Sequence, residues 1–317
     1  MPGLRQHLNR IMGLDPTLYT KSMDVQLRTL IVDAFRDLSP LPQRPYLVII
    51  DGLDECHDKG AQKSILRLLC ESITVHKLPL RFLVGSRPES HIRASFDQES
   101  LYTITHRVVL DKTFNPGRDI RVLLRDGFEK ICAEKSIPSQ VKQPWPGEGI
   151  IDLLVQRSSG QFIYAATVLK FVGAEFCSPT KQLKLVLKPD PTAFSDLDQL
   201  YTQILSVYPT AVNIVQVLGI IIAYEKNEKN RLPVIEDILG MEEGELKLVL
   251  RGLSSLMVED GRCWDEGLIP HFAHASFLDY LFNPSRSGPF YVNKQEYENQ
   301  VILRSFALIL QSIRSWR

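Results

Sequence analysis

The sequence predicts a small α/β segment, followed by a longer helical region containing a helix–turn–helix unit with a short β-hairpin. Two apolar runs, Tyr46–Ile50 and Leu80–Val84, are too short for typical helices and contain β-branched and aromatic residues. From residue 116 onward, apolar residues instead recur at the spacing of amphipathic helices. Around residues 257–272, two short apolar stretches flank an acidic turn, which predicts a two-stranded wing.

Residues 1–38 are predicted to be helical, because six apolar side chains repeat at helical spacing before two prolines. These six are Leu27, Leu30, Ile31, Ala34, Phe35 and Leu38. The strand at residues 46–50 is expected to be buried on both faces, as in a parallel sheet. An amphipathic helix around residues 65–73 connects it to the strand at residues 80–84, and a third strand is expected at residues 106–111.

The second half of the chain is predicted to be helical with two boundaries. A loop at residues 137–149 holds three prolines and two glycines, and its Trp145 either packs the loop onto neighbouring helices or serves as a docking residue. Pro189, Asp190 and Pro191 form the next boundary. Beyond them, helices at residues 233–239 and 243–257 form the helix–turn–helix, followed by the wing and a helix at residues 275–282.

Charged side chains follow both predicted strands. Asp51 comes directly after the first strand, Asp54 and Glu55 lie in the next turn, and Arg87 follows the second strand. Because the carboxyl ends of parallel strands meet at one edge of a sheet, Asp51 and Arg87 are expected on the same edge. A carboxylate there suits Mg²⁺, and a guanidinium suits phosphate. The alternative is structural, since an aspartate after a strand is commonly only a helix N-cap. His91 is predicted to be a surface histidine.

Five stretches together resemble the NACHT-type signal-transduction NTPases that are abundant in fungi. These are VIIDGLDEC, LPLRFLVGSRPE, SSGQFIYAATVLKFV, FAHASFLDYL and RSGPFYV. The resemblance runs from Asp15 to the end of the chain. It implies a remnant of a P-loop NTPase sheet at residues 1–115, a helical domain at residues 116–190 and a winged-helix domain at residues 191–283. Residues 284–317 would begin a C-terminal helical region.

The resemblance also implies roles for the charged residues, with ATP or ADP and Mg²⁺ as the ligands of the family. Asp51 would be the Walker B aspartate that holds Mg²⁺, and Asp54 and Glu55 would orient the attacking water. Arg87 would sense the terminal phosphate, and His274 in the winged helix would meet a β-phosphate. For His274 a structural role, as an N-cap or a core hydrogen bond, is an equal alternative.

The phosphate-binding loop G-x-x-x-x-G-K-[ST] is absent from the sequence. We therefore expect no ATP hydrolysis, with Asp54 and Glu55 vestigial and the chain possessing no obligatory cofactor. Without the strand that precedes such a loop, apolar faces of the sheet are expected to be partly uncovered. Two explanations stay open: a truncated copy of an active NTPase, or a short protein that works without hydrolysis.

The amino-acid composition limits the classes of partner and the cellular compartment that can be expected. The 317 residues include 37 Lys and Arg against 37 Asp and Glu, so there is no general attraction to nucleic acid or to anionic membranes. Five widely spaced cysteines argue against a disulfide framework or a zinc site. No signal peptide and no apolar run of about 20 residues is found, so the sequence predicts a soluble cytoplasmic protein.

Two other functions are compatible with parts of the sequence. The first is a protein-interaction module that pairs with homologous NACHT proteins through an exposed core surface. The second is a winged-helix DNA binder. Its recognition helix would offer Lys247 and Arg251 against Glu242, Glu243 and Glu245, which is a poor surface for phosphates. The sequence thus predicts protein partners, with no nucleic acid and no membrane.

Overall fold

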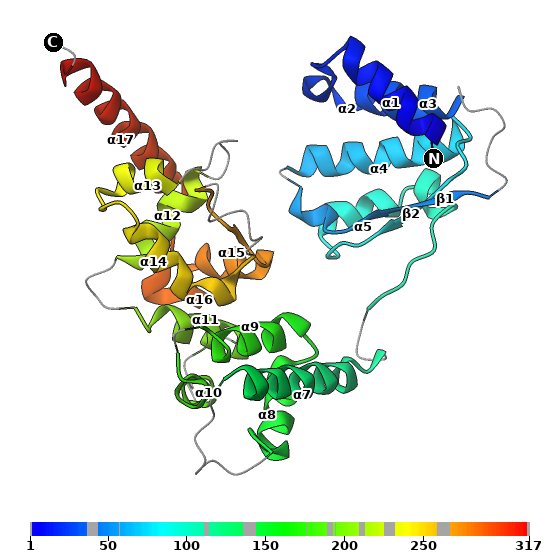
Figure 1. Cartoon of the computed structure of the whole chain (residues 1–317). Helices are drawn as coiled ribbons and strands as arrows, with labels where there is room; N and C mark the ends of the chain where they lie inside the picture. Colours follow the sequence, from blue (N-terminus) through cyan, green and yellow to red (C-terminus); the bar gives the residue numbers. More distant parts are fainter. Residues whose placement is uncertain are drawn as a thin grey trace. The chain divides into compact units, whose positions relative to one another are not determined.

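The computed structural model divides the chain into two compact units, residues 1–109 (unit 1) and 110–317 (unit 2). It describes residues 2–36, 44–56, 58–110, 114–135, 144–175, 177–188, 193, 195–208, 213–224, 232–258 and 267–315. The predominance of helix predicted from the sequence is confirmed, with two small sheets among the described residues (Figure 1).

Unit 1 consists of a parallel strand pair and the helices around it. Its helices are α1 (Pro2–Leu14), α2 (Met23–Leu27), a π-helical turn (Arg28–Val32), α3 (Asp33–Arg36), α4 (Lys59–Thr74), α5 (Ser90–Phe96) and α6 (Glu99–Tyr102), with short 3₁₀ turns at Leu18–Thr20 and Leu53–Glu55. The strands are β1 (Tyr46–Ile50) and β2 (Leu80–Val84). The predicted strand–helix–strand order is therefore confirmed. α4 begins at a strong N-cap, because Asp58 Oδ1 accepts a hydrogen bond of 2.7 Å from the amide of Ala61.

One face of the β1–β2 sheet is partly covered and the other is exposed. The strands are aligned with Tyr46 opposite Leu80 and Ile50 opposite Val84. On the covered face, Leu80 packs with Val32 and Phe35 from the N-terminal helices. Alternate residues point to the opposite face, where Leu47 is 61% and Ile49 is 66% exposed. The prediction that β1 is buried on both faces is wrong, because no described element of unit 1 covers this second face. The expected exposure of apolar sheet surface is confirmed.

The third predicted strand is also wrong for the part that the structure describes. Residues 106–110 belong to neither helix nor strand, and Val108, Val109 and Leu110 are exposed; residue 111 lies outside the described residues. Arg107 fixes this segment, since its Nη2 lies 2.8 Å from Asp97 Oδ1 and its guanidinium lies over the ring of Phe96. The apolar pattern therefore predicted a strand that the described residues do not form.

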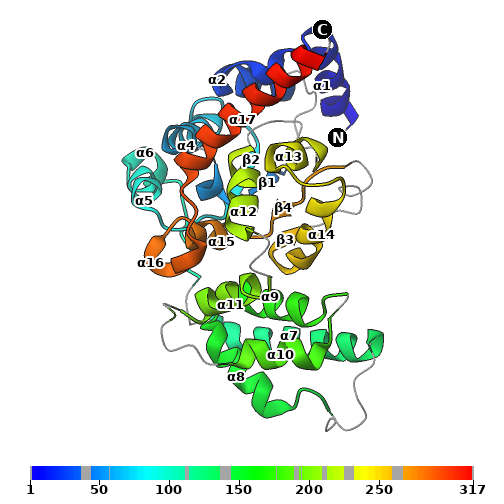
Figure 2. The ribbon, with the colours of Figure 1, turned by 90° about the vertical axis from the view of Figure 1, so that its left-hand side faces the viewer.

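Unit 2 is helical and has one apolar core. Its helices are α7 (Pro116–Glu134), α8 (Glu148–Ser158), α9 (Phe162–Val172), α10 (Pro179–Leu187), α11 (Asp196–Leu205), α12 (Ile214–Tyr224), α13 (Leu232–Leu239), α14 (Glu245–Gly252), α15 (Ala275–Leu281), α16 (Pro284–Ser287) and α17 (Lys294–Ser315), with 3₁₀ turns at Ser254–Leu256 and Gly288–Phe290. Within this unit, α7 to α11 form one part and α12 to α17 the other (Figures 1 and 2). The core is continuous from Ile120 to Val301.

Three local features explain how these helices pack. Strands β3 (Met257–Val258) and β4 (His271–Phe272) pair antiparallel, which confirms the two short strands expected there; the turn between them lies outside the described residues. Trp145 is buried edge-on against Phe128, with ring centroids 5.3 Å apart, so it packs the loop rather than offering a docking surface. α12 approaches α17 closely because Gly219 faces the ring of Tyr297, where a Cβ would collide.

Two features are absent from the described residues. None of the helices in the described ranges combines the length and the apolar character needed to cross a bilayer. In the same ranges, no cluster of three or more histidine, cysteine or acidic side chains is placed to hold a metal ion. The four described cysteines, at positions 56, 70, 132 and 177, are free thiols.

Candidate functional site

The ends of β1 and β2 bring the predicted charged residues together at one edge of the sheet. The backbones after the strands are joined, because the Gly85 amide donates to the Ile50 carbonyl (2.7 Å) and the Leu53 amide donates to the Gly85 carbonyl (3.1 Å). Asp51 is exposed, and its Oδ1 lies directly over Gly85, where an added Cβ would be 2.5 Å from that oxygen. A glycine at position 85 therefore lets the Asp51 carboxylate rest across the neighbouring strand end.

Asp54 holds the loop that carries Arg87. Its Oδ1 accepts hydrogen bonds from the Arg87 amide (2.9 Å) and the Ser86 hydroxyl (3.2 Å), and its Oδ2 lies 3.5 Å from Arg87 Nε. The Asp54 side chain is nearly buried, whereas that of Arg87 is 40% exposed. Asp54 thus ties the end of β1 to the end of β2 and orients the guanidinium. The water-orienting role implied for Asp54 stays a prediction.

Glu55 is an exposed carboxylate at the end of the same turn. Gly52 starts this turn with a φ of 70°, a left-handed conformation that favours glycine, and the Glu55 amide donates to the Gly52 carbonyl (2.9 Å). The Glu55 side chain lies against Gly52, close to the position a Cβ would occupy. Asp51 and Glu55 are consequently the exposed acids of this site.

Gln62 of α4 supports the acidic turn, a role that was not predicted from the sequence. Its Nε2 donates to the carbonyls of Asp54 (3.0 Å) and Cys56 (2.9 Å), and its Oε1 is in close contact with His91 Nε2. The side chain of His91 is nearly buried, with Nδ1 3.5 Å from Glu89, so the prediction of a surface histidine is wrong. The available signal was a glutamine one turn ahead of the apolar stripe of α4, which indicates a buried polar group that needs partners.

The donor set fits Mg²⁺ only in company with a phosphate. One or two carboxylates with water and phosphate oxygens is a common arrangement for Mg²⁺, and Asp51 with Glu55 can supply the carboxylates. Arg87 can contribute a guanidinium to a phosphate, although its Nε already faces Asp54. The sequence provides no lysine-bearing glycine loop to surround a triphosphate. The groups at this edge, among the described residues, therefore suit one end of a polyphosphate rather than the whole of it.

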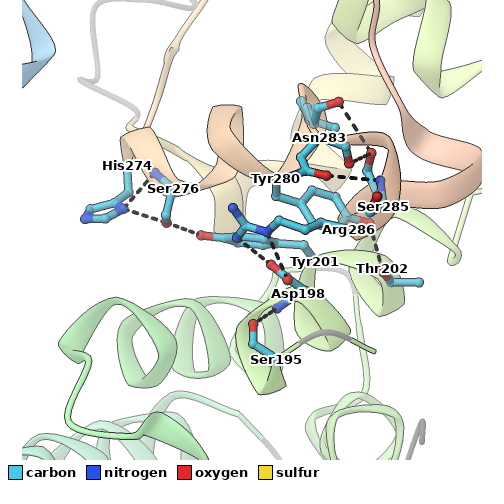
Figure 3. Close-up of polar contacts among 12 residues, drawn as sticks. Ser195, Asp198, Tyr201, Thr202, His274, Ser276, Tyr280, Asn283, Ser285 and Arg286 are labelled. Atoms are coloured by element: carbon cyan, nitrogen blue, oxygen red, sulfur yellow. Dashed lines mark hydrogen bonds and ion pairs between the residues drawn. The ribbon is translucent and has the colours of Figure 1, made fainter. Parts of the chain in front are cut away.

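His274 lies in unit 2, where it caps a helix. Its Nδ1 accepts a hydrogen bond from the Ser276 amide (3.1 Å) at the start of α15 and lies 2.6 Å from the Ser276 hydroxyl. That hydroxyl is in turn 2.8 Å from the Tyr201 hydroxyl of α11 (Figure 3). The N-cap alternative is thus what the structure shows, and contact with a β-phosphate stays a prediction.

A polar network of separate side-chain contacts also joins α11 to α15 and α16 (Figure 3). Asp198 accepts two hydrogen bonds from Arg286, from Nε (3.1 Å) and Nη2 (2.7 Å), while the Asp198 amide donates to Ser195 (3.1 Å). Burial raises the pKa of Tyr201 and of Tyr280 to about 12, so both phenols are neutral at ordinary pH. The network fixes the helix that presents His274. No sequence pattern indicated this network, because its members, such as Asp198 and Arg286, are far apart in the chain.

Comparison with known proteins extends to the first unit alone. The family model described as Nephrocystin 3, N-terminal, matches residues 1–87. The matched residues include α1 to α4 and both strands of the parallel pair, and the match ends at Arg87. No curated protein and no solved structure matches this chain.

Proposed function

We propose that this chain is a signal-transduction protein of the NACHT type whose strand-end site contacts a nucleotide phosphate with Mg²⁺ and does not hydrolyse ATP. The observation that supports the proposal is the position of Asp51 and Arg87 on one edge of the parallel β1–β2 pair. A carboxylate and a guanidinium at neighbouring strand ends are the groups that a Mg²⁺-bound phosphate requires.

The lack of hydrolysis follows from the groups that are missing and from those already engaged. Catalysis of phosphoryl transfer depends on backbone amides, a lysine and a metal ion that together stabilise charge on the transferred phosphate. The sequence has no G-x-x-x-x-G-K-[ST] to supply the amides and the lysine. Asp54 already accepts hydrogen bonds from Ser86 and Arg87, so it is poorly placed to orient an attacking water. We therefore expect the site to bind a nucleotide phosphate without hydrolysing ATP.

In this proposal residues 191–283 form a winged-helix domain with a structural rather than a DNA-binding role. The antiparallel pair β3–β4 after α14 supports the wing. Against DNA, three glutamates, at positions 242, 243 and 245, stand at the start of α14 beside Lys247 and Arg251. Retention of the protein on duplex DNA at moderate salt would contradict this part of the proposal.

The test combines a turnover assay with calorimetric binding of ATP and ADP in the presence and absence of Mg²⁺. We expect no turnover, together with weak Mg²⁺-dependent binding that is lost in Asp51→Ala and reduced in Arg87→Ala. Arg67→Ala is the matched control, because Arg67 is an exposed arginine of unit 1 that pairs with Asp24 and Glu71 on α2 and α4. ATP turnover that disappears in Asp51→Ala would refute the lack of hydrolysis. Absence of any nucleotide binding would refute the site.

The second candidate is a module that binds another protein chain without nucleotide. The uncovered face of the β1–β2 sheet, with Leu47, Ile49 and Leu83 exposed, favours it. The two candidates respond differently to substitution. Association with a NACHT protein that persists in Asp51→Ala but is lost in Ile49→Lys would favour the module, and the reverse result would favour the nucleotide site.

A further inference from the structure

Helix α17 has two apolar faces, and only one of them is covered. On the covered face, Val301 is buried, Tyr297 packs against Gly219 of α12, and Arg304 donates to the carbonyl of Ile238 in α13 (2.6 Å). The other face carries five large apolar side chains that are each at least 54% exposed. They are Ile302, Leu303, Phe306, Ile309 and Leu310, referred to below as the α17 stripe. Figure 1 shows that the C-terminal half of α17 projects from the other helices of unit 2.

The α17 stripe is contiguous rather than scattered. At about 100° per residue, its five positions fall within an arc of about 120° and extend over roughly two turns of helix. Single exposed apolar residues are normal on a protein surface, but a continuous stripe of this size marks an interaction surface. The only charged residue between positions 301 and 310 is Arg304, which faces α13.

The spacing of the stripe is symmetric about Phe306. Apolar residues stand three and four positions before it and three and four positions after it. In an antiparallel pair of identical helices with a two-fold axis beside Phe306, Ile302 lies against Ile309 of the partner subunit. On the opposite flank, Leu303 lies against Leu310 of the partner subunit, and the two phenylalanines meet at the axis. The same stripe is therefore complementary to itself.

We propose that this face is a homodimer interface in which α17 packs antiparallel on α17 of a second copy of the chain. Burying the stripe in both copies removes on the order of 1,000 Å² of surface, which is at the lower limit for a specific interface. The dimer is consequently weak and depends on protein concentration. A membrane surface fits less well, because interfacial helices flank such a stripe with several lysines and arginines, whereas Arg304 stands alone between positions 301 and 310.

The first test is the oligomeric state of the full chain, measured by sedimentation across a wide range of concentration. We expect a reversible monomer–dimer equilibrium that is abolished in Phe306→Glu, with an unchanged circular dichroism spectrum. Leu248→Glu is the matched control, since Leu248 is an exposed leucine of α14, outside the stripe, and its substitution should leave the dimer intact. A wild-type chain that stays monomeric throughout, or one that binds anionic vesicles through Phe306 as a monomer, would overturn the proposal.

The second test examines the antiparallel arrangement. Under mild oxidation, Phe306→Cys should form a disulfide between the two copies, identified as a 306–306 peptide by mass spectrometry. Leu310→Cys should not pair with itself, because antiparallel packing separates the two residues by roughly 12 Å along the helices, beyond the reach of a disulfide. Cross-linking at both positions would indicate parallel helices and would refute the proposed geometry, as would the absence of a 306–306 disulfide.

Discussion

The ion pair between Arg286 and Asp198 provides the sharpest test of what stabilises unit 2. The Asp198 side chain is 1% exposed and that of Arg286 is 23% exposed, and two hydrogen bonds of 3.1 and 2.7 Å join them. We expect Arg286→Met to lower the free energy of unfolding strongly, because the methionine fills the space of the side-chain stem but leaves a buried carboxylate without its partner.

The expected loss is about 3–5 kcal/mol. Each hydrogen bond to a charged group contributes about 1.5–3 kcal/mol, and two of them are removed. Removal of one member of a buried ion pair has an effect of the same size, about 3–5 kcal/mol. In the double variant Asp198→Asn with Arg286→Met, no unpaired charge remains, so the loss should be smaller than in Arg286→Met alone. Urea unfolding monitored by circular dichroism gives the free energy of unfolding of the wild type, of Arg286→Met and of the double variant.

A matched pair on the surface serves as the control. Arg125 and Glu148 have the same two-bond geometry, with Nε to Oε1 at 3.1 Å and Nη2 to Oε2 at 2.6 Å, but their side chains are 47% and 58% exposed. Because water and salt screen exposed pairs, Arg125→Met should change stability far less than Arg286→Met. If both variants lost equal stability, the argument from burial would be refuted.

Three further predictions follow from individual residues. Gly219→Ala should destabilise unit 2 by about 1–3 kcal/mol in urea unfolding, because the added Cβ collides with the tyrosine ring of α17, whereas Gly13→Ala, with open space around it, should not destabilise. Stability should fall between pH 10 and 12: burial raises the pKa of Tyr201 from 10.0 to about 12, so its contribution is complete below pH 10 and is lost as the pH rises through both values. Tyr201→Phe should show a smaller alkaline loss in the same denaturation assay. Gly85→Ala should weaken Mg²⁺-dependent nucleotide binding, measured by calorimetry, because the added Cβ displaces the exposed Asp51 carboxylate. The melting temperature should stay close to that of the wild type. Unchanged nucleotide affinity, or a large drop in melting temperature, would contradict this prediction.

The sequence predicted the local elements of unit 1 well because their signals are local. The apolar runs at residues 46–50 and 80–84, with a helical period between them, determine a strand–helix–strand unit. Such units place the carboxyl ends of both strands together, as Asp51 and Arg87 now show. The same pattern could not determine burial, because a short apolar strand has the same residue pattern whether one or both of its faces are covered. This is why Leu47 and Ile49 were expected to be buried.

The errors share a physical origin in contacts between distant residues. The run through Val108 and Val109 has the composition of a strand, but a strand also needs a neighbouring strand to pair with. The local pattern does not show whether that neighbour exists. The buried state of His91 depends on Gln62, 29 positions earlier, and the sequence gives no direct sign of that pairing. For His274 the local sequence was sufficient to raise the N-cap alternative, because its partner, Ser276, is only two residues away.

The continuous core of unit 2 determines where the chain can be divided. Because buried side chains from Ile120 to Val301 belong to one cluster, a cut near residue 190 would expose apolar surface on both fragments. Expression of residues 110–317 alone preserves the cluster whole and should give a protein that melts in a single cooperative transition. Because Ile151 and Leu154 of α8 and Val301 of α17 belong to this one cluster, the two helices should unfold in the same transition.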